Sequence, residues 1–558
     1  MNYLKETRHV LPLFALLLLS CCTDDKAPRV DPSSPVIAFV PEEREHLVKV
    51  GDSISLLAVV DNATRPVFSW KRDGKIVSTE RAYTFIAGSP GDYFVNFRVD
   101  AENGSAEEQL KITAAENVPP RVVLPSAAVA FVGVDKIFVA EAENAGGATY
   151  AWRLDGKLVS EDSTYTFHQT VIKPYALTLK VTTDNGQDLK KIAVTLLPEQ
   201  LPELFFDNGR YRSPANASEP RTMTVPLGKS LVLSPVILNI PNPVSFSWKV
   251  DGATRAETSE YFTFTPTAEG AYRVTVSEQG SGATAEVAVT CTPPEETYRR
   301  SGKNRYATTA FYYMPAPGQF VNSISTTPPT TPAAALAELQ KWCGKEGSYF
   351  HVGAFGGYYI VGFDHSVENK PGVPDIGIAG NPFAGWCESG IVWVMQDENG
   401  NGLPDDTWYE LKGSETGKPD TKQRYALTYY KPAASNLPVL WMDNMGRTGS
   451  VNRVGVYPAY INESYYTLVG TCLNSTFGVE SGLETSKCYA WGYVDSINSS
   501  AERPASGQFW IEDAVHVDGS PANLKYIDFV KVHTAVNAQG VAVGEISTES
   551  YIPTDLNF

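Results

Sequence analysis

Basic charge, cysteine and long apolar runs are all scarce in this sequence of 558 residues. Lys and Arg number 46 against 63 Asp and Glu, a net charge of −17 that leaves no basic surface for a run of phosphates. Nucleic acid is therefore a poor candidate partner. After the N-terminal segment no stretch approaches the roughly 18 consecutive apolar residues of a membrane-spanning helix, so no such helix is expected there.

Motifs of common enzyme classes are missing too. The four histidines of the C-terminal half lie in no HExxH arrangement and beside no nucleophile elbow. Asp364 and His365 are adjacent, but neighbours in a strand point to opposite faces, so no acid–base pair is expected. The sequence therefore predicts a protein that is not an enzyme. Paired carboxylates for glycoside hydrolysis stay open, because their separation is a three-dimensional property.

The first residues predict a signal peptide at 1–20. Lys5 and Arg8 precede an apolar run from Leu11 to Leu19, which is too short for a lasting membrane helix. Leu18-Leu19-Ser20-Cys21 resembles the lipobox of bacterial lipoproteins, which implies cleavage before Cys21 and acylation of its thiol. Cys22 fits this role less well.

A Pro- and Ser-rich tether is predicted at 21–35. Its acidic residues just after the lipid cysteine resemble the export signal of Bacteroidota surface lipoproteins. This resemblance implies a lipid-anchored protein of the outer membrane that faces the cell exterior. An orientation toward the periplasm stays open, because the signal is short.

Three internal repeats occupy residues 36–116, 117–198 and 199–293. Each contains a tryptophan, an Asp-Gly pair three residues later, a Tyr/Phe-Thr-Phe strand and a final alternating strand. The pattern predicts a β-sandwich in which the tryptophan fills the core and Asp-Gly forms a tight hairpin turn. The repeats resemble PKD or Ig-like modules and contain no cysteine pair, and we expect them to act as a stalk. The tryptophans are Trp70, Trp152 and Trp248.

Residues 298–558 form a separate domain by composition, with seven of the ten tryptophans and no further repeat. Short strands between Gly- and Pro-rich turns predict a larger β-sandwich or jelly-roll-like domain. One short helix is expected, with Thr331 as its N-cap and Gly344 as its stop. The predicted fold class is thus all-β, with three tandem Ig-like/PKD β-sandwiches followed by this larger domain.

The most specific local motif of the C-terminal domain is DENGNGLPDD, which begins at Asp397. Side-chain oxygens at relative positions 1, 3, 5 and 9, with glycine at 6, match the spacing of a calcium-binding loop. An EF-hand is disfavoured because Trp408 replaces the usual glutamate at position 12, and a metal-free hairpin is the alternative. We expect structural Ca²⁺ here, and the predicted ligands are Asp397, Asn399, Asn401, Leu403 through its carbonyl, Asp405 and Asp406.

Aromatic residues in loop-like stretches are the candidates for ligand binding. Trp386, Trp441 and Trp491 would stack on the flat face of a ring or a sugar, although any of them could instead be a core residue. Four cysteines, at 343, 387, 472 and 488, could form two bridges in an oxidising compartment. Cys472 with Cys488 is the favoured pair, and free buried thiols are the alternative.

Three stretches resemble a group of Bacteroidota surface lipoproteins found with outer-membrane corrinoid uptake systems. They are GGYYIVGFDHSVEN from Gly356, SGIVWVMQDENGNGLPDDTWYELKGSE from Ser389 and YIDFVKVHTAVNAQGVAVGEISTE from Tyr526. The resemblance implies capture of vitamin B12 or a related corrinoid and delivery to a TonB-dependent transporter. GNPFAGWCESGIV, from Gly380, departs from the group's pattern and leaves that loop's contacts open. A glycan-binding surface lipoprotein of a polysaccharide utilisation system, or a carbohydrate-active enzyme, is the alternative.

Overall fold

The computed structural model describes residues 35–558 with short gaps. The predicted signal peptide, Cys21 and the tether up to residue 34 lie outside the described residues, so those assignments stay predictions. No helix in the described part of the chain has both the length and the apolar composition needed to span a membrane. Packing gives two compact units, the first ending at Glu116 and the second beginning at Asn117. The gaps are 41–42, 62, 64, 199, 296–298, 326, 348, 384, 436, 453–455, 481–482, 502 and 541–543.

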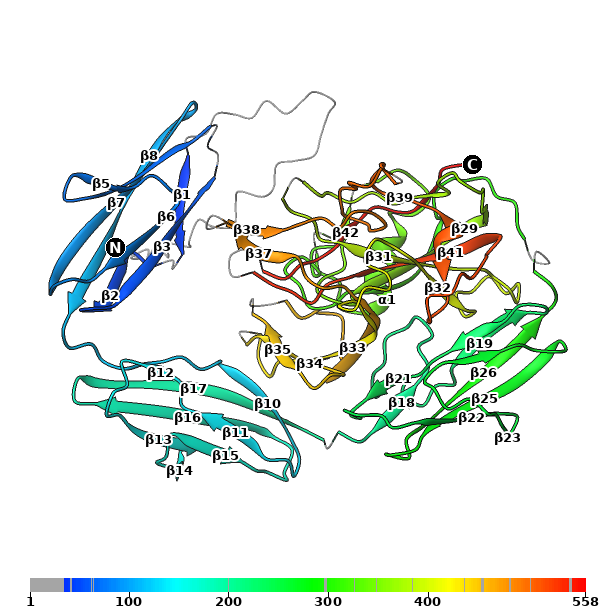
Figure 1. Ribbon diagram of the computed structural model, residues 1–558, viewed down its shortest axis with the longest axis horizontal. Coiled ribbons are helices and arrows are strands. Elements are labelled where there is room, and N and C mark those ends of the chain that lie inside the picture. Colours follow the sequence, from blue (N-terminus) through cyan, green and yellow to red (C-terminus); the bar gives the residue numbers. More distant parts are fainter. Residues whose placement is uncertain are drawn as a thin grey trace, which may run out of the picture. The chain divides into compact units, whose positions relative to one another are not determined.

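The first unit is one β-sandwich. A five-stranded sheet, in the order β2-β8-β7-β4-β5, shares a core with a three-stranded sheet, β1-β3-β6 (Figure 1). Strand β2 pairs in parallel with β8, and the other neighbours in both sheets pair antiparallel. The strands are β1 (Val36–Val40), β2 (Glu45–Lys49), β3 (Ser53–Asp61), β4 (Val67–Arg72), β5 (Lys75–Ser78), β6 (Ala82–Ile86), β7 (Gly91–Ala101) and β8 (Gly104–Ala115).

The second and third repeats have the same five-stranded sheet, with the orders β10-β17-β16-β13-β14 and β19-β26-β25-β22-β23. The prediction of three equivalent sandwiches is therefore confirmed. The second repeat contains β9 (Arg121–Val122), β10 (Ala127–Phe131), β11 (Lys136–Val139), β12 (Ala142–Glu143), β13 (Thr149–Leu154), β14 (Lys157–Ser160), β15 (Thr164–Phe167), β16 (Pro174–Thr183) and β17 (Gly186–Leu197). The third contains β18 (Glu203–Phe205), β19 (Thr222–Pro226), β20 (Leu231–Leu233), β21 (Val236–Leu238), β22 (Phe246–Val250), β23 (Ala253–Thr254), β24 (Phe262–Phe264), β25 (Gly270–Glu278) and β26 (Thr284–Thr292).

The repeated tryptophan has one role in all three repeats. Each indole is fully buried, and its Nε1 donates to a backbone carbonyl that follows it by 10 or 11 residues. The Asp-Gly pairs occupy the hairpin turns with positive φ at both residues, as at Asp73 (51°) and Gly74 (74°). That geometry belongs to a type I′ turn, which suits the twist of the flanking strands. The motif thus places a core tryptophan in the first strand of a hairpin and bonds it to the chain that follows the hairpin.

The C-terminal domain consists of two main antiparallel sheets with the orders β27-β29-β41-β31-β32-β40 and β35-β34-β33-β36. Smaller pairs complete it: β28 with β42, β37 with β38, and β30 between β39 and β43. Its strands are β27 (Thr309–Met314), β28 (Phe350–His351), β29 (Tyr358–Glu368), β30 (Ile376–Gly377), β31 (Gly390–Met395), β32 (Trp408–Leu411), β33 (Lys422–Tyr430), β34 (Val439–Asp443), β35 (Thr448–Val451), β36 (Tyr465–Cys472), β37 (Phe477–Glu480), β38 (Leu483–Ser486), β39 (Gln508–Phe509), β40 (Ala514–Val515), β41 (Tyr526–Thr534), β42 (Glu549–Ser550) and β43 (Thr554–Asp555).

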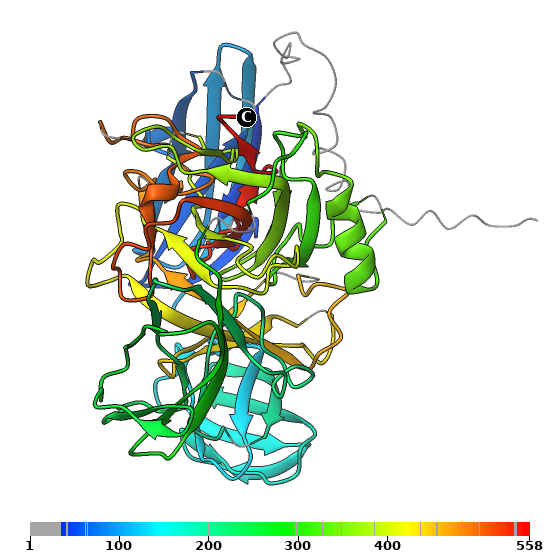
Figure 2. The ribbon, with the colours of Figure 1, turned by 90° about the vertical axis from the view of Figure 1, so that its right-hand side faces the viewer.

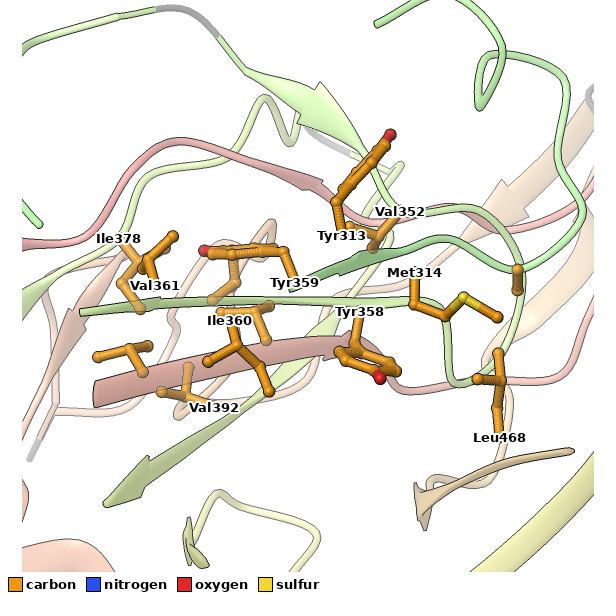
Figure 3. Packing of buried hydrophobic residues seen from close by; sticks show 14 of the residues in the cluster. Tyr313, Met314, Val352, Tyr358, Tyr359, Ile360, Val361, Ile378, Val392 and Leu468 are labelled. Carbon is orange, nitrogen blue, oxygen red and sulfur yellow. The ribbon is translucent and has the colours of Figure 1, made fainter. Parts of the chain in front are cut away.

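Strand β29 is buried on both of its faces. Tyr358 and Ile360 point to one side, and Tyr359 and Val361 point to the other (Figure 3). All four side chains are at most 1% exposed. The continuous apolar run of this strand therefore reflects packing on two sides and not the alternation of a half-exposed strand. One core joins the two main sheets, and the all-β prediction is confirmed.

The helix α1 (Pro332–Gln340) begins where the sequence predicts. Thr331 caps it, because its Oγ1 accepts a hydrogen bond of 3.2 Å from the backbone N–H of Ala334. The helix lies at the outside of the domain beside β27 (Figure 2). The Gln340 side chain accepts from Ala310 N and donates to Thr308 O, both at 2.8 Å, which fixes the helix end to the start of that strand.

The third repeat is joined to the C-terminal domain through the loop at 207–213. Arg212 and Thr467 exchange two backbone hydrogen bonds, and the buried Lys531 donates from Nζ to the carbonyl of Gly209 at 2.9 Å. Gly209 has a φ of +78°, and a Cβ there would overlap the indole of Trp408. Only glycine meets both the backbone and the space requirement at this position.

The predicted disulfide between Cys472 and Cys488 is wrong. Cys488 is bonded to Cys387, and Cys472 and Cys343 are free thiols. The reason is a strand-like contact that the sequence does not display: the N–H of Cys387 donates to the carbonyl of Ser486 at 2.8 Å. This contact brings Cys387 beside the chain that follows β38, whereas Cys472 is buried at the end of β36.

Candidate functional site

Trp386 lies in a short loop that is closed by its own backbone. Phe383 and Trp386 exchange two hydrogen bonds, with N–H to O distances of 3.0 and 2.9 Å. Gly385 makes this turn possible with a φ of +87°, a value that side-chain-bearing residues rarely adopt. The Cys387–Cys488 disulfide then fastens the loop to the chain that follows β38. The backbone that carries Trp386 is therefore held by a disulfide and by hydrogen bonds.

The ring of Trp386 packs against a buried cluster that includes Leu473, Tyr489 and Val536, and exposed apolar side chains lie on the adjoining segments. Phe383 is 62% exposed and Val479 is 63% exposed. Trp386 is partly exposed and meets the ring of Phe477 edge-on, with 6.5 Å between centroids. Because Phe477 and Val479 are two residues apart in β37, their side chains lie on the same face of that strand. We call Phe383, Trp386, Phe477 and Val479 the Trp386 patch.

The other two predicted ligand residues lie elsewhere and have partners of their own. Trp441 in β34 packs on Gly449 of β35, where a Cβ would overlap the ring. Trp491 faces the guanidinium of Arg503. The Arg503 Cζ lies 5.9 Å from the centroid of the Trp491 ring and 4.1 Å from the centroid of the Trp510 ring. Among the described residues no ring contact joins any two of the three predicted tryptophans. The structure does not bring them together into one site.

The predicted calcium loop has part of the expected geometry. The N–H of Gly402, at position 6, donates to Asp397 Oδ2 at 3.0 Å, and Gly402 has a φ of +74°. Asp397 is 1% exposed, and its Oδ1 is buried without a hydrogen-bond partner. Strand β32 follows the loop from Trp408, so the exiting helix of an EF-hand is absent there. An orphaned carboxylate oxygen is the feature that a hard cation would satisfy.

Other loop side chains bond to one another. The amide nitrogen of Asn399 donates to Asp405 Oδ1 at 3.0 Å and to Asp406 Oδ1 at 2.9 Å, and Asn401 donates to both oxygens of Asp405. Burial raises the pKa of Asp406 to about 7. Leu403 is half exposed. The predicted ligand atoms are all oxygens, the type that calcium prefers, but Asn399 Oδ1, Asn401 Oδ1 and the Leu403 carbonyl already accept backbone N–H groups. The six calcium ligands therefore stay a prediction.

A second group of acidic side chains was missed in the sequence. Glu388, Asp495 and Glu549 each place one carboxylate oxygen within 4.8 Å of the others. They come from the residue pair before β31, from the segment after Cys488 and from β42. Asp495 is 2% exposed and Glu549 is 5% exposed. Because the three residues are far apart in the sequence, they form no local motif. The one sequence signal is that Glu388 lies in GNPFAGWCESGIV, from Gly380, the stretch that departs from the pattern of the lipoprotein group.

This group is held by backbone donors at its rim. The N–H groups of Asn381 and Glu549 donate to the two oxygens of Asp495 at 2.8 and 3.0 Å. The N–H of Ser547 donates to Glu388 Oε1 at 3.1 Å, and His351 Nδ1 lies 2.6 Å from Glu549 Oε1.

Burial, together with the neighbouring carboxylates, raises the pKa of Glu388 to about 10 and that of Glu549 to about 9. Burial also raises the pKa of Asp495, to about 6.

The expectation that Asp364 and His365 point away from each other is wrong. His365 Nδ1 lies 2.9 Å from Asp364 Oδ1, and its Nε2 lies 3.0 Å from Asp555 Oδ2. The register of β29 with β41 shifts between Gly362 and Val367, which breaks the regular alternation at this point. Burial lowers the pKa of His365, but the bonds to Asp555 and Asp364 outweigh it and leave the pKa raised.

The comparisons with known proteins concern the repeats. A family model of the PKD-like domain matches residues 34–101 and 131–183. No curated protein matches the sequence. Among solved structures, the titin I-band fragment I67–I69 is 12% identical with a TM-score of 0.14, and it covers 47% of this chain and 99% of its own. The fibronectin(III)-like modules of Clostridium thermocellum CbhA are 14% identical with a TM-score of 0.17, covering 29% and 95%. These scores are too low to carry an argument, whereas the family match and the shared strand order show that the chain contains PKD-like, Ig-like domains.

Proposed function

We propose that this protein is a lipid-anchored surface protein that captures vitamin B12 or a related corrinoid with its C-terminal domain. It then passes the ligand to a TonB-dependent outer-membrane transporter. The resemblance of the stretches from Gly356, Ser389 and Tyr526 to corrinoid-associated surface lipoproteins supports this proposal. An outer-membrane location, with lipid on Cys21, belongs to the same proposal.

The observation that carries the proposal is the Trp386 patch. A corrin ring offers an apolar face on which indole and phenyl rings can stack. The disulfide and the paired backbone of the loop hold Trp386 before any ligand arrives, so little conformational freedom is lost on binding. In the repeats, by contrast, each repeated tryptophan is fully buried, so those rings stabilise the fold and are not accessible to a ligand.

Calorimetric titration of the full chain, produced without its signal sequence, with cyanocobalamin tests the proposal. Phe383→Ser and Val479→Ser remove exposed apolar area from the patch and should each weaken binding several-fold. Val373→Ser is the matched control, because Val373 is also an exposed valine (42%) but lies outside the patch. Absence of heat up to millimolar cyanocobalamin, or equal weakening by all three substitutions, contradicts the proposal.

A glycan is the second candidate, favoured by a cleft of about 430 Å³ where the second and third repeats meet the C-terminal domain. Tyr430 and Tyr465 line this cleft together with polar groups of Gln200 and Arg212. Such a mixture of aromatic and hydrogen-bonding side chains suits a sugar. Binding on a glycan array with no response to cyanocobalamin would select this candidate. Release of products from a polysaccharide would instead indicate a carbohydrate-active enzyme.

A further inference from the structure

A smaller cleft, of about 220 Å³, lies where the third repeat meets the C-terminal domain. The third repeat contributes the turn between β19 and β20, and the C-terminal domain contributes β32, the residue after β40 and residues 521–524. Lys229 joins the two walls, because its Nζ lies 3.2 Å from Glu295 Oε2 and donates to the carbonyl of Asn523 at 3.4 Å. The cleft is therefore held in shape by its own rim.

Two polar side chains of the C-terminal wall have no partner. Tyr409 in β32 is 4% exposed, and its ring meets the His516 ring edge to face, with 5.4 Å between centroids. Both line the cleft, and among the described residues no hydrogen bond reaches the Tyr409 hydroxyl or the His516 ring. A hydroxyl that is buried without a hydrogen bond costs free energy, which a ligand in the cleft would recover.

The Tyr409 hydroxyl lies on the side of this cleft. Burial raises the pKa of Tyr409, and so do, in falling order, the charges of Glu398, Glu295 and Asp406. The first two of these carboxylates line the cleft. The hydroxyl oxygen also keeps some exposed surface, so a ligand can reach it.

We propose that this cleft binds one neutral, polyhydroxylated molecule of the size of a monosaccharide. Lys229 disfavours a cation, and Glu295 and Glu398 disfavour an anion, so the mixed charges select a neutral ligand. The Tyr409 hydroxyl both donates and accepts, and a neutral imidazole does the same through its two nitrogens. Each hydroxyl of a sugar has this double capacity.

The protonation state of His516 agrees with this chemistry. Burial lowers its pKa, the charge of Lys229 lowers it as well, and Asp518 opposes both. The net shift is downward, so the ring is neutral at pH 7 and keeps one accepting nitrogen.

Size separates this cleft from the surface proposed for the corrinoid. Pockets for drug-sized ligands measure about 300–1,000 Å³, so a cleft of about 220 Å³ admits a single sugar ring but no corrin. The cleft is also distinct from the larger one that Tyr430 and Tyr465 line. This inference therefore does not depend on the proposed function.

Calorimetric titration of the full chain, produced without its signal sequence, tests the site with glucose, galactose, mannose and N-acetylglucosamine. At least one of these neutral sugars should bind. The uronate and the amino sugar of the same configuration should bind about tenfold more weakly, because each brings a charge that the cleft disfavours. Tyr409→Phe removes a single hydroxyl and should weaken binding of the neutral sugar by about fivefold.

Tyr359→Phe is the matched control. Tyr359 is also a buried tyrosine, but its hydroxyl is hydrogen-bonded to Ser550 Oγ at 2.7 Å, outside the cleft. Tyr359→Phe should melt lower than the parent chain and bind the sugar equally well. Tyr409→Phe should do the reverse, because its hydroxyl has no protein partner to lose.

Hydrogen exchange locates the bound sugar. The neutral sugar should slow exchange in the turn between β19 and β20 and at residues 521–524, since it contacts both walls. This protection should be weaker in Tyr409→Phe at the same sugar concentration, and it should be unchanged in Tyr465→Phe, which alters the larger cleft.

The site is overturned if none of the four neutral sugars gives heat up to about 50 mM, where a Kd of a few millimolar would saturate. It is also overturned if Tyr409→Phe titrates like the parent, if Tyr465→Phe alone weakens binding, or if the charged sugars bind as well as the neutral ones. Binding that depends on Tyr409, with no response to cyanocobalamin, supports the site and refutes the proposed function alone.

Discussion

The tryptophans of the repeats and those of the C-terminal domain are used in opposite ways. Trp70, Trp152 and Trp248 are 0% exposed and occupy one equivalent position in three sandwiches. Of the seven in the C-terminal domain, six are partly exposed, and each has different neighbours. A tryptophan that recurs at a regular spacing in the sequence is therefore a core residue. The role of a tryptophan at a unique position has to be determined individually.

Neighbours explain the difference. Trp408 and Trp441 pack on the edge of the domain core and on the bare backbone of Gly209 and Gly449, and both stay partly exposed. A repeat tryptophan is instead enclosed by side chains from two sheets, as Trp70 is by Phe39 and Phe97. Truncation should therefore unfold a repeat but leave the C-terminal domain folded.

Trp70→Ala should give the largest effect, a loss of about 3–5 kcal/mol in the unfolding free energy of the first repeat. The cavity left by a fully buried indole cannot collapse between two paired sheets. Hydrogen exchange of the full chain should lose protection at residues 36–116 and keep it beyond Asn117. Trp491→Ala is the control. Equal loss from both variants would erase the distinction between the two tryptophan classes.

Gly209→Ala should destabilise the second unit by about 2–3 kcal/mol, because the methyl group must displace the Trp408 ring. Gly228→Ala is a matched control: Gly228 also has positive φ (+90°), but nothing lies within 4 Å of an added Cβ. The control should lose only about 1 kcal/mol from backbone strain. Denaturant unfolding monitored by tryptophan fluorescence measures both, and similar losses would show that the glycine backbone alone matters.

Calcium should stabilise the C-terminal domain through the loop at 397–406, by about 2.7 kcal/mol at a concentration of 100 times its Kd. Asp397→Asn should remove that gain, because it neutralises the carboxylate whose Oδ1 has no protein partner. Differential scanning calorimetry with calcium or chelator measures the shift. An unchanged response in Asp397→Asn would show that calcium does not act through this loop.

The sequence predicted what is local or periodic. The repeats follow from a recurring Trp and Asp-Gly, and the helix start follows from Thr331 and Pro332, because hairpins and caps depend on neighbours within a few residues. The Asp397 loop is a local motif for the same reason.

Contacts between distant segments were beyond such reasoning. The Cys387–Cys488 bridge and the Glu388–Asp495–Glu549 group depend on which loops the sheets bring together. The Asp364–His365 contact was misjudged because a register shift in β29 replaced the ideal alternation. The disulfide, the acidic group and the Asp364–His365 contact all depend on sheet register, and register is set by packing of the whole domain.

Trp386→Ala should have the smallest but most diagnostic effect, a weakening of cyanocobalamin binding by about tenfold, or about 1.4 kcal/mol. Loss of one stacked indole face has about this value. Trp386→Phe should lie between the parent and Trp386→Ala, because a smaller ring still stacks. Trp491→Ala should bind like the parent, since Arg503 faces that ring. Calorimetric titration at one salt concentration compares the three variants. If Trp491→Ala weakens binding and Trp386→Ala does not, the partly exposed Trp386 ring is structural, and the contrast between the two tryptophan classes no longer points to a ligand.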